Sequence, residues 1–301
     1  MQIINKITVI ILTYKTDKKI LYKCLKSINK NIKILIVENS KKFENKNFFL
    51  NNFKNLRIIC SGENLGYARG NNYGLNKIRT KYALILNPDT KLKSNFFKNL
   101  SMVIKKTENF YLIGCNHVNN KKILPAGYFN DQKNKDFERI INTKKIDFLT
   151  KVEWIRGFSM IINLKKFKKN EIFDKNYFLY FEEIDLCKSI QKRLGNIYFV
   201  KSLEVNHLGF KSSIGSLKSK NNHAENLRNW HYMWSSFYFY KKNYSYLTAL
   251  KKMLGKLIRA AFKTLFYYFT FQTAKKEKYL HRFLGISCSL LGMKSFYRIE
   301  N

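Results

Sequence analysis

The sequence predicts an α/β fold built around a mostly parallel β-sheet. Short β-rich runs alternate with helical patterns over the first hundred residues. The runs at 7–13, 33–38 and 82–87 are apolar nearly throughout, which is typical of strands buried on both faces of a parallel sheet. A hydrophobic fraction of 45% in 301 residues is enough for a real core. Because such sheets bind ligands at the carboxyl ends of their strands, the residues that follow each run are candidate site residues.

The remaining elements follow in chain order. After the first strand, Leu21, Leu25 and Ile28 recur at helical spacing and predict a helix over 17–30. A further strand is expected at 57–60, and helices at 45–54, 67–79 and 94–106. Residues 117–150 are polar, rich in Lys and Asn and poorly periodic, and we interpret them as an insertion. A helix to about Leu194 with a Gly195 cap, strands at 197–200 and 203–206, and a helix over 221–242 come next.

The chain changes character from Tyr244 onward. Lys252, Lys256, Arg259 and Lys263 follow one another at steps of 4, 3 and 4 and form one basic helical face, with apolar residues over the rest. The aromatic cluster FYYFTF follows at 266–271. A basic amphipathic helix of this kind suits the surface of an anionic bilayer. The alternative is a terminal helix packed on the core with its lysines in water. We expect a compact domain over 1–243 and a helical membrane-association segment over 244–301.

Composition limits the functional classes. The formal net charge is +37, with 57 Lys and Arg against 20 Asp and Glu, which indicates either a polyanionic partner or codon bias toward Lys. The five cysteines form no CxxC pair, so neither a zinc site nor a disulfide framework is expected, and free thiols fit a reducing cytoplasm. No segment reaches 18 uncharged apolar residues, and the run at 7–13 has no cleavage site behind it, so neither a membrane span nor export is expected.

Three segments after expected strands have both a plain and a functional interpretation. In NPDT (87–90), Asp89 can be a turn residue or can hold Mg²⁺ or Mn²⁺ against a diphosphate. The segment 62–74 matches neither the GxGxxG nor the P-loop spacing, yet its backbone NH groups and Arg69 could bind phosphates or a base. His207 ends a strand, where a metal or phosphate role competes with a structural one.

Three carboxylates crowd together after aromatic residues in NYFLYFEEIDLC (176–187). On a helical wheel of about 100° per residue, Glu183 aligns with the apolar residues of the helix, Glu182 lies at the edge, and Asp185 points to the far side. Acids favour the first turn of a helix, and this explains Glu182 and Asp185. It does not explain an inward Glu183, which must be paired or line a pocket. Partial burial would make it a better proton acceptor.

Seven segments, taken together and in order, resemble the family-2 glycosyltransferases, in particular the bacterial rhamnosyltransferase-like branch. They are ILTYK, IVENS, ENLGYARGNN, ILNPDT, WIRGFSM, FDKNYFLYFEEIDLC and NHLGFKSS. The resemblance runs from about Ile7 to Lys242, with 117–150 excepted. It implies a single Rossmann-like nucleotide-sugar domain of the GT-A type that transfers sugar with inversion and depends on Mg²⁺ or Mn²⁺.

The resemblance also implies roles for individual residues. Glu183 occupies the position of the catalytic base, with Glu182 and Asp185 as secondary acids, and the metal ligands would be Asp89 and His207. The implied nucleotide-sugar contacts are Thr13, Tyr14, Glu38, Asn64, Gly66, Arg69, Asn87, Asp89 and Gly157. Glu38 and Glu183 stand where the family usually has Asp. The change at Glu38 bears on the uracil- or thymine-type contact, whereas Glu183 keeps the chemistry but reaches about one methylene further, so its pocket must be adjusted.

We therefore expect a hexosyltransferase that moves a sugar such as rhamnose from a nucleoside diphosphate to a cell-envelope glycan or lipid-linked acceptor. It would act in the cytoplasm, as a peripheral protein at the inner face of the plasma membrane. Two rival functions remain open. A non-catalytic nucleic-acid-binding protein would explain the net charge, although no recognised nucleic-acid motif is present. A nucleotidyltransferase would use a strand-end Asp, but it would need acidic pairs where only Asp89 is near.

Overall fold

The structure, a computed structural model, describes residues 3–118, 124–141, 148–168, 172–207 and 223–298. Contacts between residues divide the chain into two units. The first comprises Met1–Leu65, Gly70–Phe173 and Leu186–Ser216, and the second comprises Gly66–Arg69, Asp174–Asp185 and Leu217–Asn301. The part of the NHLGFKSS motif that follows His207 lies outside the described residues.

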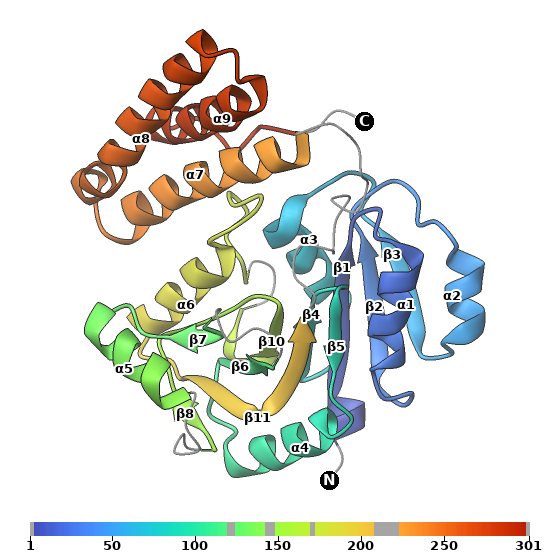
Figure 1. Ribbon diagram of the computed structural model, residues 1–301. Coiled ribbons are helices and arrows are strands. Elements are labelled where there is room, and N and C mark those ends of the chain that lie inside the picture. The colour runs from blue at the N-terminus through green and yellow to red at the C-terminus, as the bar shows by residue number, and fades with distance from the viewer. Residues whose placement is uncertain (1–2, 119–123, 142–147, 169–171, 208–222, 299–301) are drawn as a thin grey trace. The chain divides into compact units, whose positions relative to one another are not determined.

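A nine-stranded sheet forms the centre of the first unit (Figure 1). Its strand order is β3-β2-β1-β4-β10-β6-β11-β5, and β8 pairs with β11. The strands are β1 Ile7–Thr13, β2 Lys33–Glu38, β3 Leu56–Cys60, β4 Tyr82–Leu86, β5 Thr90–Leu92, β6 Leu112–His117, β8 Thr150–Lys151, β10 Ser159–Asn163 and β11 Ile197–His207. A separate pair is formed by β7 (Ala126–Gly127) and β9 (Trp154–Ile155).

The sheet is mixed, and its parallel part is the part that the apolar runs predict. Strand β1 pairs in parallel with β2 and β4, β2 with β3, and β6 with β11. Strand β10 is antiparallel to β4 and β6, and β11 is antiparallel to β5 and β8. The α/β fold class is therefore confirmed. Because β1, β2 and β4 run in the same direction, the residues that follow them meet at one edge of the sheet.

The helices of the first unit connect these strands. They are α1 Lys18–Lys26, α2 Lys46–Asn52, α4 Phe96–Lys106 and α5 Asp131–Ile141, with 3₁₀ helices at Ile3–Lys6 and Leu164–Lys166. Helix α1 begins at Asp17, whose carboxylate accepts hydrogen bonds from the backbone N–H of Lys19 (2.9 Å) and Ile20 (3.0 Å). Helices α3 (Gly66–Leu75) and α6 (Glu182–Lys192) have residues in both units.

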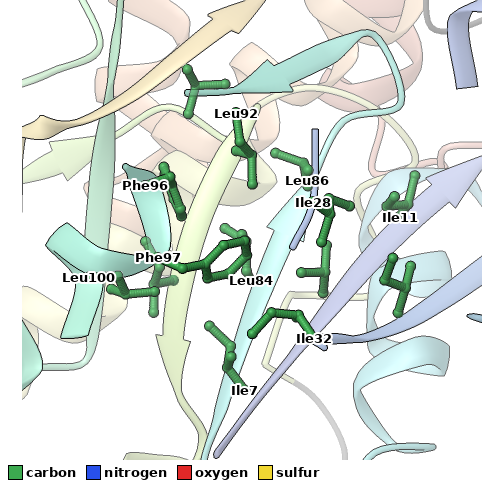
Figure 2. Close-up of a cluster of buried hydrophobic side chains, with 14 of the residues drawn as sticks. Ile7, Ile11, Ile28, Ile32, Leu84, Leu86, Leu92, Phe96, Phe97 and Leu100 are labelled. Carbon is green, nitrogen blue, oxygen red and sulfur yellow. The ribbon is translucent and has the colours of Figure 1, made fainter. Parts of the chain in front are cut away.

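The core of the first unit lies where β1 and β4 meet the helices and loops beside them. Figure 2 shows part of it, with Ile7 and Ile11 from β1, Leu84 and Leu86 from β4, and Phe96, Phe97 and Leu100 from α4. Ile7, Ile11 and Leu84 are each 0% exposed. Each such aliphatic side chain stabilises the folded state by about 1.5–3 kcal/mol when fully buried. The residues at the sheet edge are therefore attached to well-packed strands.

Two expectations from the sequence need correction. The strands expected at 197–200 and 203–206 are one strand, β11, with a register shift between Val200 and Glu204. The segment 117–150 contains β7 and α5 despite its poor periodicity, and its interpretation as an insertion stays a prediction. The left-handed residue after α6 is Leu194 (φ 54°) rather than Gly195.

Gly195 is instead needed for close packing. Its N–H donates to the Ile190 carbonyl (3.0 Å) and that of Leu194 donates to the Gln191 carbonyl (2.9 Å), the pattern of a Schellman motif with Leu194 in the left-handed position. A Cβ at Gly195 would lie 2.6 Å from Ile190 Cγ2 and 2.7 Å from Tyr111 Cδ2.

The second unit contains three long helices, α7 His223–Asn243, α8 Tyr246–Phe269 and α9 Thr273–Leu290 (Figure 1). They share a small core made by Met233, Phe237, Ala249, Met253 and Ile286. The helix expected over 221–242 is confirmed within the described residues as α7, and the expected tail helix is a pair, α8 and α9. Within the described part of the chain, no helix is both long and apolar enough to cross a membrane. The division at 243/244 stays a prediction.

Candidate active site

The first group of predicted site residues lies at the ends of β1 and β2. Thr13 ends β1 and Glu38 ends β2, and the two are paired in register. Both are buried, and the Thr13 hydroxyl donates to Glu38 Oε2 at 2.6 Å. Glu38 Oε1 accepts from the Ser40 hydroxyl (2.7 Å) and the Lys15 N–H (3.1 Å). These three donors hold the carboxylate in one position at the sheet edge, with Tyr14 half-buried beside it.

The NPDT segment forms a tight turn between β4 and β5. The Asn87 carbonyl accepts hydrogen bonds from the Thr90 N–H (3.2 Å) and the Thr90 hydroxyl (2.6 Å). The Asn87 N–H donates to the Phe158 carbonyl at 2.9 Å. The turn interpretation is therefore correct, but a turn does not by itself explain why the Asp89 side chain is buried. That side chain is only 1% exposed, although it lies in a connection between two strands.

Asp89 lies next to His207, the second predicted metal ligand. Strand β5 pairs with the end of β11 so that Thr90 is opposite His207, and His207 Nε2 lies 3.3 Å from Asp89 Oδ1. The imidazole stacks on Phe158, with ring centroids 5.2 Å apart and planes at 12°. Gly157, also predicted to be a site residue, lies in the turn that presents Phe158. The pair is thus held by packing as well as by its own contact.

This pair fits a divalent cation. Carboxylate oxygen and imidazole nitrogen are both ligands of Mn²⁺, and Mg²⁺ is bound through one or two carboxylates together with substrate phosphates. Among the described residues there is no group of three or more His, Cys, Asp or Glu that could hold an ion by protein ligands alone. A cation at Asp89 and His207 would therefore take its remaining ligands from phosphate oxygens and water.

The glycine-rich segment approaches its neighbours closely. Asn64 Oδ1 accepts from Asn39 Nδ2 at 3.2 Å, and the Leu65 N–H donates to Asn39 Oδ1 at 3.2 Å. Gly66 has φ +74°, and a Cβ there would lie 2.8 Å from Phe178 Cγ. Only glycine fits this backbone and this approach. The side chain of Arg69 is exposed.

The three acids occupy the first turn of α6, as expected, but their exposure differs from the helical-wheel prediction. Glu182 is 5% exposed and Asp185 is 3% exposed, whereas Glu183 is half-buried. Leu194, expected on the apolar face, follows the end of the helix and is 91% exposed. Asp185, predicted to lie on the side of the helix away from its apolar residues, is buried.

Asp185 has several polar partners within its own unit, the second. Lys242 Nζ lies 2.6 Å from Asp185 Oδ2 and 2.7 Å from Asp174 Oδ2. Asn243 Nδ2 donates to Asp185 Oδ1 at 2.7 Å, and the Tyr177 hydroxyl donates to the same oxygen at 3.3 Å. Burial lowers the pKa of Lys242, but its bonds to the two carboxylates outweigh this effect and raise the pKa overall. Lys242 thus ties both ends of the segment 174–185 to the end of α7.

Glu182 and Glu183 form an acidic pair in a poorly solvated place. Burial and the neighbouring charge of Glu183 raise the pKa of Glu182 well above its usual range. Oε2 of Glu182 accepts no hydrogen bond from any described residue. The residues before the pair, Tyr180 (φ 70°) and Phe181 (φ 68°), are both in the left-handed region. Two such non-glycine residues in succession indicate a constrained backbone, which is typical of functional sites.

Two contributors were missed by reasoning from sequence. His117 ends β6, and its Nε2–H donates to the His207 carbonyl at 3.1 Å. Burial lowers the pKa of His117, which favours its neutral form. The ring also contacts the His207 ring, with centroids 5.5 Å apart. The short run LIGC at 112–115, followed two residues later by His117, was a usable signal, because the strand expected before His207 also ends in a histidine. Lys242 had no local signal, since its partners lie 57 and 68 residues earlier.

Comparison with known proteins bears on these observations. The model of the family described as "Glycosyl transferase family 2" matches residues 8–183, more than half of the chain. The chain belongs to glycosyltransferase family 2. The match covers β1, β2, β4 and the NPDT turn, and it ends at Glu183, so the family expected from the seven segments is confirmed.

Individual relatives are distant. The low-salt glycan biosynthesis hexosyltransferase Agl10 of Haloferax volcanii is 24% identical over 204 residues, which are 64% of this chain and 64% of that protein. The matched stretch thus spans just under two thirds of the relative's length.

Two solved structures share the fold. One is the mannosyltransferase PcManGT from Pyrobaculum calidifontis in complex with GDP-Man and Mn²⁺, with a TM-score of 0.54, 11% identity, and coverage of 95% of this chain and 87% of that one. The other is GalNAc-T7 with UDP, GalNAc and Mn²⁺, with a TM-score of 0.50, 13% identity, and coverage of 68% and 44%.

Proposed function

We propose that the protein is a metal-dependent, inverting hexosyltransferase. It would move a sugar from a nucleoside diphosphate to a hydroxyl group of a cell-envelope glycan or lipid-linked acceptor. The observation that carries this proposal is the buried Asp89 carboxylate 3.3 Å from His207, at the carboxyl edge of the sheet in a family-2 chain. The Mn²⁺ and the nucleotides named with both fold neighbours, and the hexosyltransferase name of the relative, support the same reaction class.

The acids supply the proton chemistry. A sugar hydroxyl is a poor nucleophile, and Glu183 would remove its proton as the oxygen attacks the anomeric carbon. The new bond forms while the bond from that carbon to the diphosphate oxygen breaks, and the nucleoside diphosphate leaves with the electron pair. Attack from the face opposite the leaving group inverts the anomeric centre. Burial and the charge of Glu183 raise the pKa of Glu182, which disfavours a second negative charge beside the base.

The edge residues would hold the donor. Asp89 and His207 would ligate Mg²⁺ or Mn²⁺, which when bound offsets the charge that develops on the leaving diphosphate. Glu38, fixed by Thr13, is an acceptor for N–H or O–H groups of the nucleoside. Tyr14, Asn64, Gly66, Arg69, Asn87 and Gly157 complete the proposed donor contacts. The rhamnosyltransferase-like motifs make a deoxyhexose such as rhamnose the first donor sugar to test.

The deciding experiment is a panel of UDP-, GDP- and dTDP-sugars with Mn²⁺, read as release of nucleoside diphosphate. We expect release with one donor class, and a fall of about 10²–10⁴-fold in Glu183→Gln, which keeps the shape but cannot accept a proton. The control is Glu44→Gln, which changes an exposed carboxylate.

Release by Glu183→Gln at the wild-type rate with the true acceptor would remove the base assignment. No release with any donor, together with tight and strongly salt-dependent binding to nucleic acid, would favour the rival polyanion-binding function. Release of inorganic diphosphate from a nucleoside triphosphate would favour a nucleotidyltransferase.

We also infer that the protein works at the inner face of the plasma membrane, held there by α8. Its exposed side carries large apolar residues: Leu247 (66% exposed), Ile258 (60%), Phe262 (67%), Leu265 (60%) and Phe269 (71%). At about 100° per residue these fall within one arc, which also contains exposed Lys251 and lies next to exposed Lys252, Lys256 and Arg259. Ala249, Met253 and Ala260 occupy the packed side. An apolar stripe beside a basic stripe fits an anionic bilayer, whose lipids offer both apolar depth and negative charge.

A further inference from the structure

The second unit presents a cluster of aromatic rings that the proposed chemistry does not use. Tyr180 and Phe181 both contact Tyr232 of α7, with ring centroids 5.7 and 5.6 Å apart. Phe181 also contacts Phe239 at 5.4 Å. Tyr232 remains 44% exposed although two rings pack against it. We call Tyr180, Phe181 and Tyr232 the aromatic platform.

The backbone beneath the platform is held in an unfavourable conformation. Tyr180 and Phe181 adopt φ values of 70° and 68°, in the left-handed region that residues other than glycine rarely occupy. Strain of this kind persists only where surrounding contacts enforce it, and it clusters at ligand-binding sites. As a result, two consecutive side chains reach the same exposed ring. In a regular extended strand these two side chains would point to opposite faces.

The platform lies beside the proposed base. Tyr180 and Phe181 directly precede Glu182 and Glu183 in the chain. Burial raises the pKa of Tyr180 to about 12; the positive charge of Arg228 opposes this, and the charges of Glu182 and Glu183 add to it. The Tyr180 hydroxyl therefore stays protonated and can donate at neutral pH. A base must lie within hydrogen-bond reach of the acceptor hydroxyl, so an acceptor sugar engaged by Glu183 would lie near the residues that directly precede this base in the chain.

We propose that the aromatic platform is the acceptor subsite, and that a hexopyranoside stacks its C–H face on the exposed ring of Tyr232. This inference rests on the proposed transferase function. The face of an aromatic ring carries negative quadrupole charge, and it attracts the weakly positive C–H groups that line one side of a pyranose. Tyr232 lies beyond the region 8–183 that matches the family model, so the family match does not assign it a role.

The test is saturation-transfer NMR on the full chain with methyl hexopyranosides as probes. In the wild type we expect saturation on the C–H protons of one pyranose face. Tyr232→Leu keeps an apolar side chain but removes the ring, and should lower that transfer about fivefold, as for loss of one ring contact. Tyr232→Phe keeps the ring and should retain it. Tyr246→Leu is the matched control, because Tyr246 of α8 is 43% exposed, close to the 44% of Tyr232.

Undiminished transfer in a folded Tyr232→Leu variant overturns the proposal, and so does an equal loss in Tyr246→Leu. Tyr232→Gln gives the same comparison if the Leu variant aggregates. The readout needs neither donor nor turnover. A failure here with normal nucleotide release would therefore leave the transferase function intact, whereas loss of release with normal sugar contact would point to the donor site.

Discussion

Glu182 has almost no access to water, and this gives it a measurable effect on stability. Burial and the charge of Glu183 raise its pKa in the folded state, so the folded protein keeps a proton that the unfolded chain loses. Its stabilising contribution is complete below the unfolded pKa, near 4.5, and is lost as pH rises through the folded pKa. Glu182→Gln, which cannot ionise, should therefore be more stable than the wild type at about pH 8, but not at about pH 4.

Urea denaturation of both proteins between these pH values measures the difference. Each unit of pKa shift is worth about 1.4 kcal/mol of unfolding free energy. Identical pH slopes for the two proteins would show that the Glu182 carboxyl is solvated in the native state. Glu44→Gln, at an exposed position, should leave the slope unchanged.

Asp89 allows a prediction about metal binding that does not depend on the donor sugar. Asp89→Asn removes the charge but keeps the size, and should weaken Mn²⁺ binding about tenfold or more, because the remaining neutral oxygen and the His207 ring are poorer ligands. Electron paramagnetic resonance of free Mn²⁺ in a titration measures this directly. Asp136→Asn, whose carboxylate is 51% exposed, serves as the control. Equal affinity in wild type and Asp89→Asn would exclude Asp89 as a ligand.

At the scale of elements, the sequence was most informative where local pattern decides structure. The apolar runs predict β1, β2 and β4 to within about one residue, because strands buried on both faces are apolar throughout. The residues after them, including Thr13, Glu38 and Asp89, reach the same edge for the same topological reason. Boundaries after α6 were less accurate, because the Schellman motif places Leu194 rather than Gly195 in the left-handed position.

The exposure of the acids could not be predicted in this way. A helical wheel considers only the helix itself, and it placed Asp185 on the side away from the apolar residues. Its burial depends on Lys242 and Asn243 of α7, which no local periodicity connects to it. Sequence periodicity therefore predicts the burial of side chains on an apolar face. It does not predict the burial of polar side chains whose partners are distant in the sequence.

The bridge from Lys242 makes a prediction for the segment 174–185 as an element. Lys242→Met leaves two carboxylates without their shared cation. The substitution should lower the free energy of unfolding by about 2 kcal/mol. The loss is smaller than for a fully buried ion pair, because the Lys242 side chain is 37% exposed. Since this segment carries Glu182 and Glu183, kcat should fall more than KM for the donor rises. Lys242→Arg should restore part of both.

Lys241→Met is the matched control, one residue earlier on the same helix and exposed. Chemical denaturation together with steady-state kinetics separates the two effects. A Lys242→Met variant with wild-type stability and wild-type kcat would show that the bridge does not position the acids.

At the scale of the whole molecule, the charge and the helices of the second unit determine how membrane binding can be tested. Deleting everything after Asn243 would remove Ala249, Met253 and Ile286, which share a core with Met233 and Phe237 of α7. Such a truncation would lose binding by unfolding α7 as well as by removing α8. Substitutions on the exposed side of α8 leave that core in place and are the cleaner test.

The last prediction concerns the two stripes of α8. Phe262→Ser with Phe266→Ser removes side chains that are 67% and 49% exposed, so folding should be unaffected. Binding to vesicles of phosphatidylglycerol and phosphatidylcholine should weaken by about 10²-fold or more, since each buried aromatic contributes about 1.5–3 kcal/mol.

Lys252→Gln with Lys256→Gln should weaken the free energy of vesicle binding by about 1 kcal/mol per charge removed. Binding of this variant should also depend less on salt concentration. Leu194→Ser, at a 91% exposed position of the first unit, should bind like the wild type. Equal sedimentation of all four proteins, or equal binding to pure phosphatidylcholine, would contradict a membrane role for α8. The chain's net charge of +37 would then be explained by codon bias or by another polyanionic partner.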